Sequence, residues 1–153
     1  VGGALRALGL LPDGARVIDV GSGAGFPGLP VRIVWPVHLT LVEARAKRAA
    51  FLEAVVGALR LDGVTVIAAR AEVLARDPAH REAYDVALSR ALAPARVLAE
   101  LTLPFVRVGG VSAAVKGERL EAELSEAARA LQMLQAEATV HPLPAGGRML
   151  TLR

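Results

Sequence analysis

The chain has 153 residues, a length that fits one domain with a full hydrophobic core and leaves little room for a second. Hydrophobic residues make up 54% of it, which excludes a disordered chain, because such a chain could not bury enough apolar surface to offset its ordering entropy. The absence of cysteine excludes disulfides, thiolate metal sites and a cysteine nucleophile. The three histidines are scattered without metal-ligand spacing, so no metal site is expected.

The formal net charge is +3, a mild excess that permits contact with a polyanion without requiring it. Arg, Glu or Pro interrupts the longest apolar stretches, so we expect no membrane span. The first residues lack a basic segment followed by a long apolar core, which makes the cytoplasm the expected location. Because the sequence starts at Val1 rather than Met, we expect a piece of a longer protein.

Short β-type runs alternate with longer runs that have helical spacing. The expected strands are Arg16–Val20, His38–Glu43, Val64–Ala68, Tyr84–Leu88 and Val111–Val115. The expected helices are Val1–Leu10, Arg45–Arg60, Pro94–Leu103 and Leu120–Leu134. The apolar face of the second helix comprises Ala49, Leu52, Val56 and Leu59, and that of the last comprises Leu120, Leu124, Ala127, Leu131 and Leu134.

This alternation predicts right-handed βαβ units and a largely parallel sheet with helices on both faces. After the last helix, Ala136–Pro142 and Arg148–Arg153 read as a hairpin joined by a Pro/Gly turn over residues 143–147. The total is seven strands, of which the final pair is antiparallel. We therefore expect a single α/β domain over residues 1–153 with the Rossmann-like fold of class I S-adenosyl-L-methionine methyltransferases, because the ordinary dinucleotide-binding fold ends differently.

The sharpest motif is a glycine loop, DVGSGAGFPG, directly after the first expected strand. Gly21, Gly23 and Gly25 let the backbone turn tightly and approach a ligand that a Cβ would exclude. A dehydrogenase would have its third glycine where Phe26 stands. The spacing instead favours S-adenosyl-L-methionine, which has no pyrophosphate and would lie with its methionine portion and ribose against the loop. A tight turn with packing glycines is the simpler alternative.

Two acids follow the next two strands. Glu43 ends the second strand, where an acid accepts hydrogen bonds from both ribose hydroxyls. By itself it is equally compatible with a solvated acid near the basic residues 45, 47 and 48, but beside the glycine loop the ribose role is favoured. Glu72 follows the third strand, where a loop can offer a backbone N–H and a side-chain acceptor to adenine. Alone, Glu72 more often marks a helix N-terminus.

The methyl acceptor is narrowed by elimination. Transfer to pyrimidine C5 needs a cysteine, and exocyclic amino transfer uses an N/D-P-P-Y/F loop where this chain has Ser89–Pro94. Ribose 2′-O transfer commonly uses two lysines and two acids, and the only lysines are Lys47 and Lys116. The N7 atom of guanine remains, and because its lone pair carries no proton, no general base is expected.

The motifs together resemble a known family. The run DVGSGAGFPGLP (Asp19–Pro30) is similar to the signature of the bacterial 16S ribosomal RNA guanine-N7 methyltransferases, historically called glucose-inhibited division protein B. Further motifs follow in the family's order, from about Gly14 to Arg153: KRAAFLEAV (Lys47–Val55), RAE (Arg70–Glu72), SRALAP (Ser89–Pro94), VGG (Val108–Gly110) and KG (Lys116–Gly117).

The resemblance implies methyl transfer from S-adenosyl-L-methionine to N7 of a guanine in 16S ribosomal RNA (guanine 527 by the resemblance alone), leaving S-adenosyl-L-homocysteine. It implies that 16S rRNA or the small ribosomal subunit is the partner, and we expect the chain to be a monomer. By position, Gly21 and Phe26 contact the cofactor; Glu43, Ala44 and Arg45 line its ribose and adenosine side; Ala71 and Glu72 hold the adenine; and Arg90 lies at the cofactor pocket beside the incoming base, as a positioning residue. A surface salt bridge is the alternative for Arg90.

The chain departs from the family at its ends, where an N-terminal helical extension and a basic C-terminal tail are missing, so trimming at both ends is expected. Two other functions stay open. An NAD(P)-binding oxidoreductase domain is weakened by Phe26 and by the terminal hairpin. A non-catalytic module that binds RNA or protein also stays open as a hypothesis, because a fold does not determine a function. The polar groups at the cofactor positions argue against it.

Overall fold

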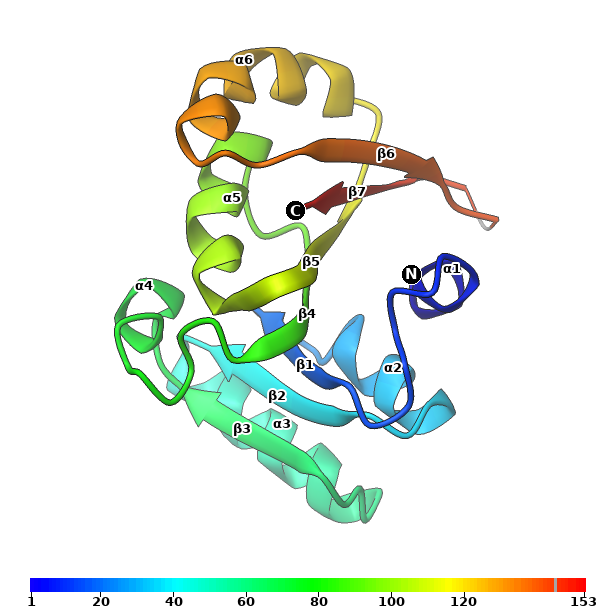
Figure 1. Cartoon of the computed structure of the whole chain (residues 1–153). Helices are drawn as coiled ribbons and strands as arrows, with labels where there is room; N and C mark the ends of the chain where they lie inside the picture. The colour runs from blue at the N-terminus through cyan, green and yellow to red at the C-terminus, as the bar shows by residue number, and fades with distance from the viewer. Residues whose placement is uncertain (145) are drawn as a thin grey trace.

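The computed structural model describes residues 1–144 and 146–153, and a seven-stranded sheet in the order β3-β2-β1-β4-β5-β7-β6 forms its centre (Figure 1). The strands are β1 Arg16–Val20, β2 His38–Glu43, β3 Val64–Ala68, β4 Tyr84–Arg90, β5 Val106–Lys116, β6 Ala138–Pro142 and β7 Arg148–Leu152. The pairs among β1 to β5 are parallel, whereas β7 runs antiparallel to both β5 and β6.

Helices cover both faces of the sheet. They are α1 Gly2–Ala7, α2 Gly28–Val34, α3 Ala46–Ala58, α4 Ala71–Leu74, α5 Ala95–Thr102 and α6 Leu120–Met133, with a 3-10 turn, η1, at Leu103–Phe105. One core cluster joins buried side chains of α1, α2 and α3 to one face of the strands. Two others join α4, α5, α6 and η1 to the opposite face.

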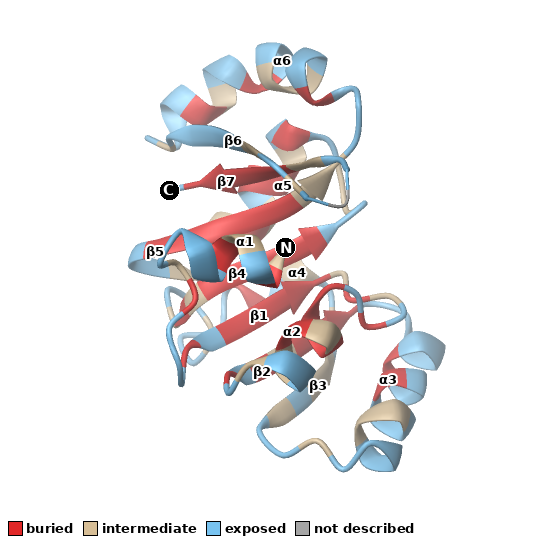
Figure 2. Cartoon of the chain, turned by 90° about the vertical axis from the view of Figure 1, so that its right-hand side faces the viewer, coloured by how far each residue is buried: buried red, intermediate tan, exposed pale blue. Residues whose placement is uncertain are grey.

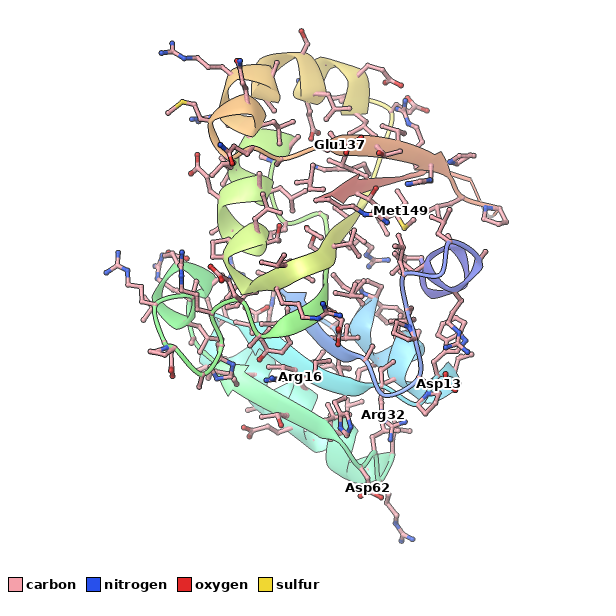
Figure 3. The ribbon with its side chains drawn as sticks, in the orientation of Figure 1. Asp13, Arg16, Arg32, Asp62, Glu137 and Met149 are labelled. Carbon is pink, nitrogen blue, oxygen red and sulfur yellow. The ribbon has the colours of Figure 1, made fainter. Side chains whose placement is uncertain are left out.

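Strand β1 shows how the sequence sorts its side chains between these faces. Val17 packs in the cluster of α1, α2 and α3, while the next residue, Ile18, packs in the cluster of α4. Successive side chains of a strand point to opposite faces, so a strand covered on both sides is mostly apolar on both, and Asp19 is the buried polar exception in β1. Buried residues accordingly concentrate in the central strands (Figure 2), and Met149 of β7 is among the fully buried side chains (Figure 3).

The predicted fold class is confirmed, including the antiparallel final pair. The expected bounds of β1, β2 and β3 match the structure, and the two hairpin strands are found with ends shorter by one or two residues. Of the predicted turn over residues 143–147, residue 145 lies outside the described residues. The short helices α2 and α4 were not predicted as elements, because each is two turns or less and carries too little periodicity. The alternative for Glu72, a helix N-terminus, is confirmed, since Glu72 lies in the first turn of α4.

The prediction for the fifth strand was too short. It was expected to begin at Val111, because Gly109 and Gly110 read as a break, but β5 begins at Val106. The sheet absorbs the two glycines with a shift of register between β4 and β5. Gly109 has a φ of +80°, and a Cβ on Gly110 would lie 2.7 Å from the carbonyl oxygen of Asp85. The glycines therefore form an irregularity within a strand.

The predicted apolar face of α3 is wrong at its end. Ala49 and Leu52 are buried and Val56 is partly buried, but Leu59 is 52% exposed. The helix ends at Ala58, and Arg60 adopts a left-handed φ of 49° in the turn that leads to β3. Leu134 is likewise exposed, because it follows the end of α6. Helical spacing predicts a shared face only while the helix continues.

Contacts at the edge of the sheet fix the segment that leads into β3. The guanidinium of Arg32 on α2 donates from Nε and Nη2 to the carbonyl oxygen of Asp62, at 3.0 and 2.7 Å (Figure 3).

Across residues 1–144 and 146–153, none of the helices is both long enough and apolar enough to span a membrane.

A matched pair of substitutions on α3 tests this packing. We expect Leu52→Ala to lower the free energy of unfolding by about 2–5 kcal/mol, because it leaves a cavity at a fully buried position. We expect Leu59→Ala to change it by no more than about 0.5 kcal/mol, as for other exposed positions. Urea unfolding followed by circular dichroism measures both values, and equal losses would contradict the described end of the helix.

Candidate functional site

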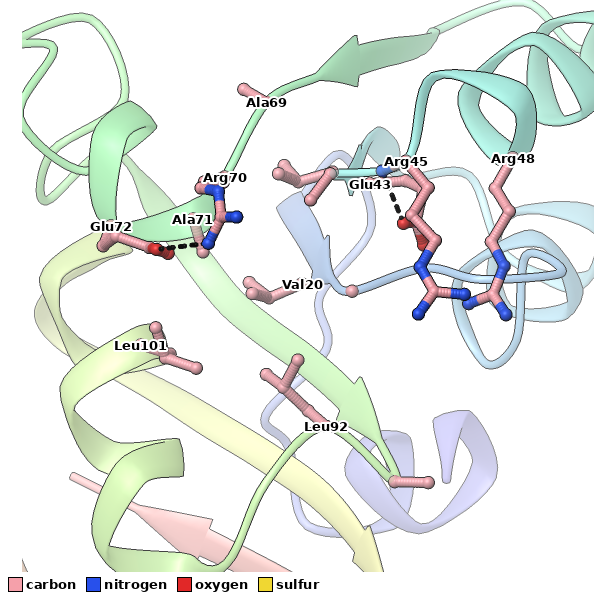
Figure 4. A pocket seen from close by; sticks show the side chains of 14 residues that line it. Val20, Glu43, Arg45, Arg48, Ala69, Arg70, Ala71, Glu72, Leu92 and Leu101 are labelled. Atoms are coloured by element: carbon pink, nitrogen blue, oxygen red, sulfur yellow. Dashed lines mark hydrogen bonds and ion pairs between the residues drawn. The ribbon is translucent and has the colours of Figure 1, made fainter.

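A cleft of about 410 Å³ lies at the carboxyl ends of β1, β2 and β3 and beside the loop that follows β4 (Figure 4). The strand order reverses between β1 and β4, since the chain runs outward from β1 to β3 and then returns to the other side of β1. Open α/β sheets bind ligands outside the carboxyl ends of their strands at such a point. The cleft is lined by Val20, Gly21, Val42, Glu43, Ala44, Arg45, Arg48, Ala69, Arg70, Ala71, Glu72, Ala91, Leu92 and Leu101.

Gly21 forms the floor of the cleft where the chain leaves β1. Its φ is +71°, in the left-handed region that favours glycine, and its N–H donates to the carbonyl oxygen of Val42 at 2.9 Å. A Cβ at this position would lie 2.6 Å from Cδ1 of Leu92. The backbone turn and the close approach of the Leu92 side chain therefore both depend on the missing Cβ.

Glu43 joins the end of β2 to the glycine loop. Its side chain is buried, with 6% exposure; Oε2 accepts the N–H of Gly23 at 3.0 Å, and Oε1 accepts the N–H of Arg45 at 2.9 Å. The alternative of a solvated acid is therefore wrong. Each carboxylate oxygen has two acceptor positions, so one on each oxygen remains for a ligand in the cleft.

The opposite wall combines charged and apolar groups. Arg70 precedes α4 and lies 3.6 Å from the carboxylate of Glu72 in an exposed ion pair, and Ala71 begins the helix between them (Figure 4). Leu92 and Leu101 form an apolar side of the cleft. A cleft with apolar walls and a buried carboxylate at one end suits a ligand in which a flat apolar ring is joined to a group that carries hydroxyls.

The structure brings most of the predicted site residues together. Those that line the cleft are Gly21, Glu43, Ala44, Arg45, Ala71 and Glu72. Gly23 is tied to the cleft through its hydrogen bond with Glu43. Gly25 instead faces the core, because a Cβ there would lie 2.3 Å from Cδ1 of Leu29.

Phe26 and Arg90 lie elsewhere, against a second cleft of about 440 Å³ beside α1 and α2. The Phe26 ring is half-exposed, and the guanidinium carbon of Arg90 lies 5.5 Å from its centroid. Among the described residues Arg90 has no carboxylate within ion-pair distance, which contradicts a surface salt bridge. Ala91 lines the first cleft, so the end of β4 separates the two clefts.

Sequence reasoning missed several residues of the first cleft. Leu92 lies inside a motif that drew attention only through Arg90, and Leu101 lies on α5, where its spacing marks it as an ordinary core residue. Arg48 and Arg70 reach the cleft from exposed positions. No local pattern distinguishes these side chains. The positions of Leu101 and Arg48 depend on how α5 and α3 pack against the sheet, and those of Leu92 and Arg70 on the segments that follow β4 and β3.

Asp19 supports the glycine loop from below. It is fully buried, its Oδ2 accepts the N–H of Gly28 at 2.8 Å, and its Oδ1 has no hydrogen-bond partner in the described part of the chain. Burial raises the pKa of Asp19 from 3.8 to about 7, although the Gly28 N–H and the charge of Arg90 act in the opposite direction. The side chain therefore links β1, the start of α2 and the end of β4.

Comparison of the sequence with known proteins identifies the family to which the chain belongs. A family model described as rRNA small subunit methyltransferase G matches residues 3–150. The chain belongs to this family. Ribosomal RNA small subunit methyltransferase G of Roseiflexus castenholzii is 51% identical over 121 residues, which are 78% of this chain and 52% of the relative. The protein of the same name from Thermoanaerobacter pseudethanolicus is 42% identical over 130 residues, 84% of this chain and 54% of the relative.

This chain thus spans about half the length of the curated relatives that it matches.

Solved structures of other proteins share the fold of this chain. A variant of MtNAS in complex with S-adenosylmethionine matches with a TM-score of 0.74 and 22% identity, over 98% of this chain and 58% of that one. A SAM-dependent methyltransferase from Aquifex aeolicus matches with a TM-score of 0.71 and 20% identity, over 98% and 87%.

The raised pKa of Asp19 predicts a pH dependence of stability. Between 3.8 and about 7 the folded chain holds a proton that the unfolded chain has lost, so this group's contribution to stability falls as the pH rises through that range. Asp19→Asn removes the titratable group, and with it this pH dependence, but keeps a side-chain oxygen that can accept the N–H of Gly28. We expect the stability of the variant relative to the parent to increase by about 3 kcal/mol between about pH 5 and about pH 8. Urea unfolding at constant ionic strength measures this difference, and a constant difference across that range would contradict the prediction.

Proposed function

We propose that the first cleft binds S-adenosyl-L-methionine, with the ribose hydroxyls on Glu43, the adenine beside Ala71 and Glu72, and the methionine portion over Gly21. The observation that carries this proposal is the buried Glu43 carboxylate, which is held by Gly23 at the mouth of a cleft floored by a glycine without room for a Cβ. The volume of about 410 Å³ lies within the range of small-molecule sites, about 300–1,000 Å³. The residues present therefore fit this cofactor.

S-adenosyl-L-methionine supplies a methyl group activated on a sulfonium. The protein's contribution is then to orient the reactants and to exclude water, which are effects of position. Glu43 fixes the ribose, Gly21 allows the backbone to approach, and Leu92 and Leu101 cover the apolar side. Transfer to N7 of guanine needs no general base, because that lone pair carries no proton.

We propose that the acceptor is N7 of a guanine in 16S ribosomal RNA, within naked RNA or the small subunit, and that S-adenosyl-L-homocysteine is the product. Family membership supports this acceptor, and so do relatives named ribosomal RNA small subunit methyltransferase G. The half-exposed Phe26 ring and the neighbouring Arg90 guanidinium offer flat surfaces on which an unpaired base can stack. We further propose that residues 1–153 act as one domain, as a monomer and in the cytoplasm, where the RNA is assembled.

Two measurements test the proposal. Calorimetry with S-adenosyl-L-methionine, and with NADH as the competing ligand, decides between a methyltransferase and an oxidoreductase. Labelled methyl transfer to 16S RNA and to small subunits, followed by mapping of the modified base, separates an enzyme from a non-catalytic module. The transfer assay uses the chain and a form with the full length of its relatives. If the full-length form binds the cofactor but labels none of these substrates, the proposed activity is wrong.

Arg90 allows a sharper test within the enzyme. We expect Arg90→Ala to lower methyl transfer at least tenfold, a loss of about 1.4 kcal/mol in transition-state stabilisation. We expect the free energy of unfolding to change by only about 0.5 kcal/mol, because the side chain is exposed and makes no ion pair among the described residues.

Arg90→Lys is the control for charge, since lysine keeps the charge but loses the flat guanidinium. Transfer rates and thermal melting are measured on the same preparations. If stability and transfer fall together in Arg90→Ala, Arg90 has a structural role.

A further inference from the structure

The KG motif, which the cofactor site leaves unexplained, meets the SRALAP motif in the structure. Nζ of Lys116, in the KG motif at the end of β5, donates to the carbonyl oxygen of Ala93 at 2.6 Å, within the SRALAP motif that follows β4. The same nitrogen donates to Oε2 of Glu123 on α6, also at 2.6 Å. The Lys116 side chain is 9% exposed and that of Glu123 25%, so the ammonium is nearly buried and its carboxylate partner is partly buried. A buried ammonium requires such partners.

Glu123 has a second function at the start of α5. Its Oε2 also accepts the N–H of Ala95 at 3.0 Å, which is the first helical residue of α5. The preceding residue, Pro94, has no side-chain oxygen with which to cap the helix, and no side chain at the N-cap position makes a cap hydrogen bond. A carboxylate from another helix therefore satisfies one of the free N–H groups at this terminus.

The segment held in this way forms one wall of the cofactor cleft. Ala91 has a φ of 51°, a left-handed conformation that is rare for a residue with a Cβ and that persists only where the surroundings enforce it. Leu92 follows, lines the cleft and approaches Gly21. In the described part of the chain, the only side-chain hydrogen bonds to the backbone of residues 91–95 come from Lys116 and Glu123.

We propose that Lys116 and Glu123 are positioning residues that hold the loop 91–94 so that Leu92 stays beside Gly21, and that they thereby set the shape of the cofactor cleft. Without the pair, the carbonyl of Ala93 and the N–H of Ala95 lose their partners, and Ala91 can return to an ordinary negative φ. Leu92 then leaves its position in the wall. The proposal rests on the proposed function for the identity of the ligand, S-adenosyl-L-homocysteine or its methylated form.

The chain contains a matched control for a purely stabilising ion pair. Glu121 lies two residues before Glu123 on α6 and pairs with Arg148 of β7, and that arginine also donates to the carbonyl oxygen of Gly117. This pair also joins α6 to the sheet, at the residue of β7 that lies opposite Lys116, but it makes no hydrogen bond to the loop 91–94. Glu121→Gln therefore removes an ion pair and leaves the loop in place.

The test measures binding of S-adenosyl-L-homocysteine to the whole chain by calorimetry. We expect Lys116→Met and Glu123→Gln each to weaken binding about tenfold, a coupling within the range found for residues of one network. We expect Lys116→Arg to retain most of the affinity, and Glu121→Gln to change it less than about twofold. Leu92→Ala should weaken binding alone, and adding Lys116→Met to it should weaken binding little further, because both act through the same side chain.

Amide hydrogen exchange of residues 91–95, without ligand, separates this proposal from the proposed function. We expect faster exchange there in Lys116→Met and Glu123→Gln, and no change in Glu121→Gln. If the parent chain binds no cofactor, the proposed function fails, while exchange still tests the loop. Unchanged exchange overturns the positioning role. So does parent-like affinity in the two variants, or an equal loss of affinity and melting temperature in all of them, Glu121→Gln included. Because Glu123→Gln keeps an oxygen for Ala95, it carries the test if Lys116→Met does not fold.

Discussion

The hydrogen bond between the Gly23 N–H and the buried Glu43 carboxylate is the interaction on which the site depends. It ties the loop after β1 to the end of the neighbouring strand, and the other oxygen of the same carboxylate accepts the N–H of Arg45 at the entry to α3. A buried carboxylate is stable only when such donors surround it. The constraint therefore fixes the turn, the end of β2 and the start of the next helix together, and leaves the remaining acceptor positions of Glu43 at the cleft.

A second buried carboxylate supports the same loop from the other side. Asp19 accepts the N–H of Gly28 at the start of α2, and the charge of Arg90 lies near enough to lower its pKa against the effect of burial. The glycine loop is thus held at both ends by acids from adjacent strands. Such a loop needs little rearrangement when a ligand enters, which lowers the entropic cost of binding.

The end of β4 divides the carboxyl edge of the sheet into two regions of different character. On one side lies the cleft between Glu43 and Leu92; on the other lies the more apolar cleft where Arg90 covers Phe26. The loop that begins there is anchored from behind by Lys116 and Glu123. Under the proposed function, a cofactor in the first cleft and an acceptor in the second would meet at this shared strand end, and Lys116 of β5 and Glu123 of α6 hold the loop between them.

The sequence by itself determined the alternation of strands and helices, the antiparallel ending and the position of the glycine loop. These features are local: apolar periodicity marks a strand or helix, and a left-handed turn such as that of Gly21 favours glycine. It also placed Glu43 beside that loop, because the carboxyl ends of parallel strands share one edge. It also singled out Glu72 after the third strand. The resemblance to the family added further candidates, of which the structure gathers Ala44, Arg45 and Ala71 in the same cleft.

Only the tertiary structure decided the rest, because those features depend on residues far apart in the chain. Nothing near Leu59 in the sequence shows that the helix ends before it, and β5 extends past its glycines only because β4 offers a shifted register. The separation of Arg90 from the first cleft, and the contact of Lys116 with Ala93, follow from the way β5 and α6 pack beside β4. The raised pKa of Asp19 has the same origin, since burial is a property of the packed molecule and not of the motif that contains the residue.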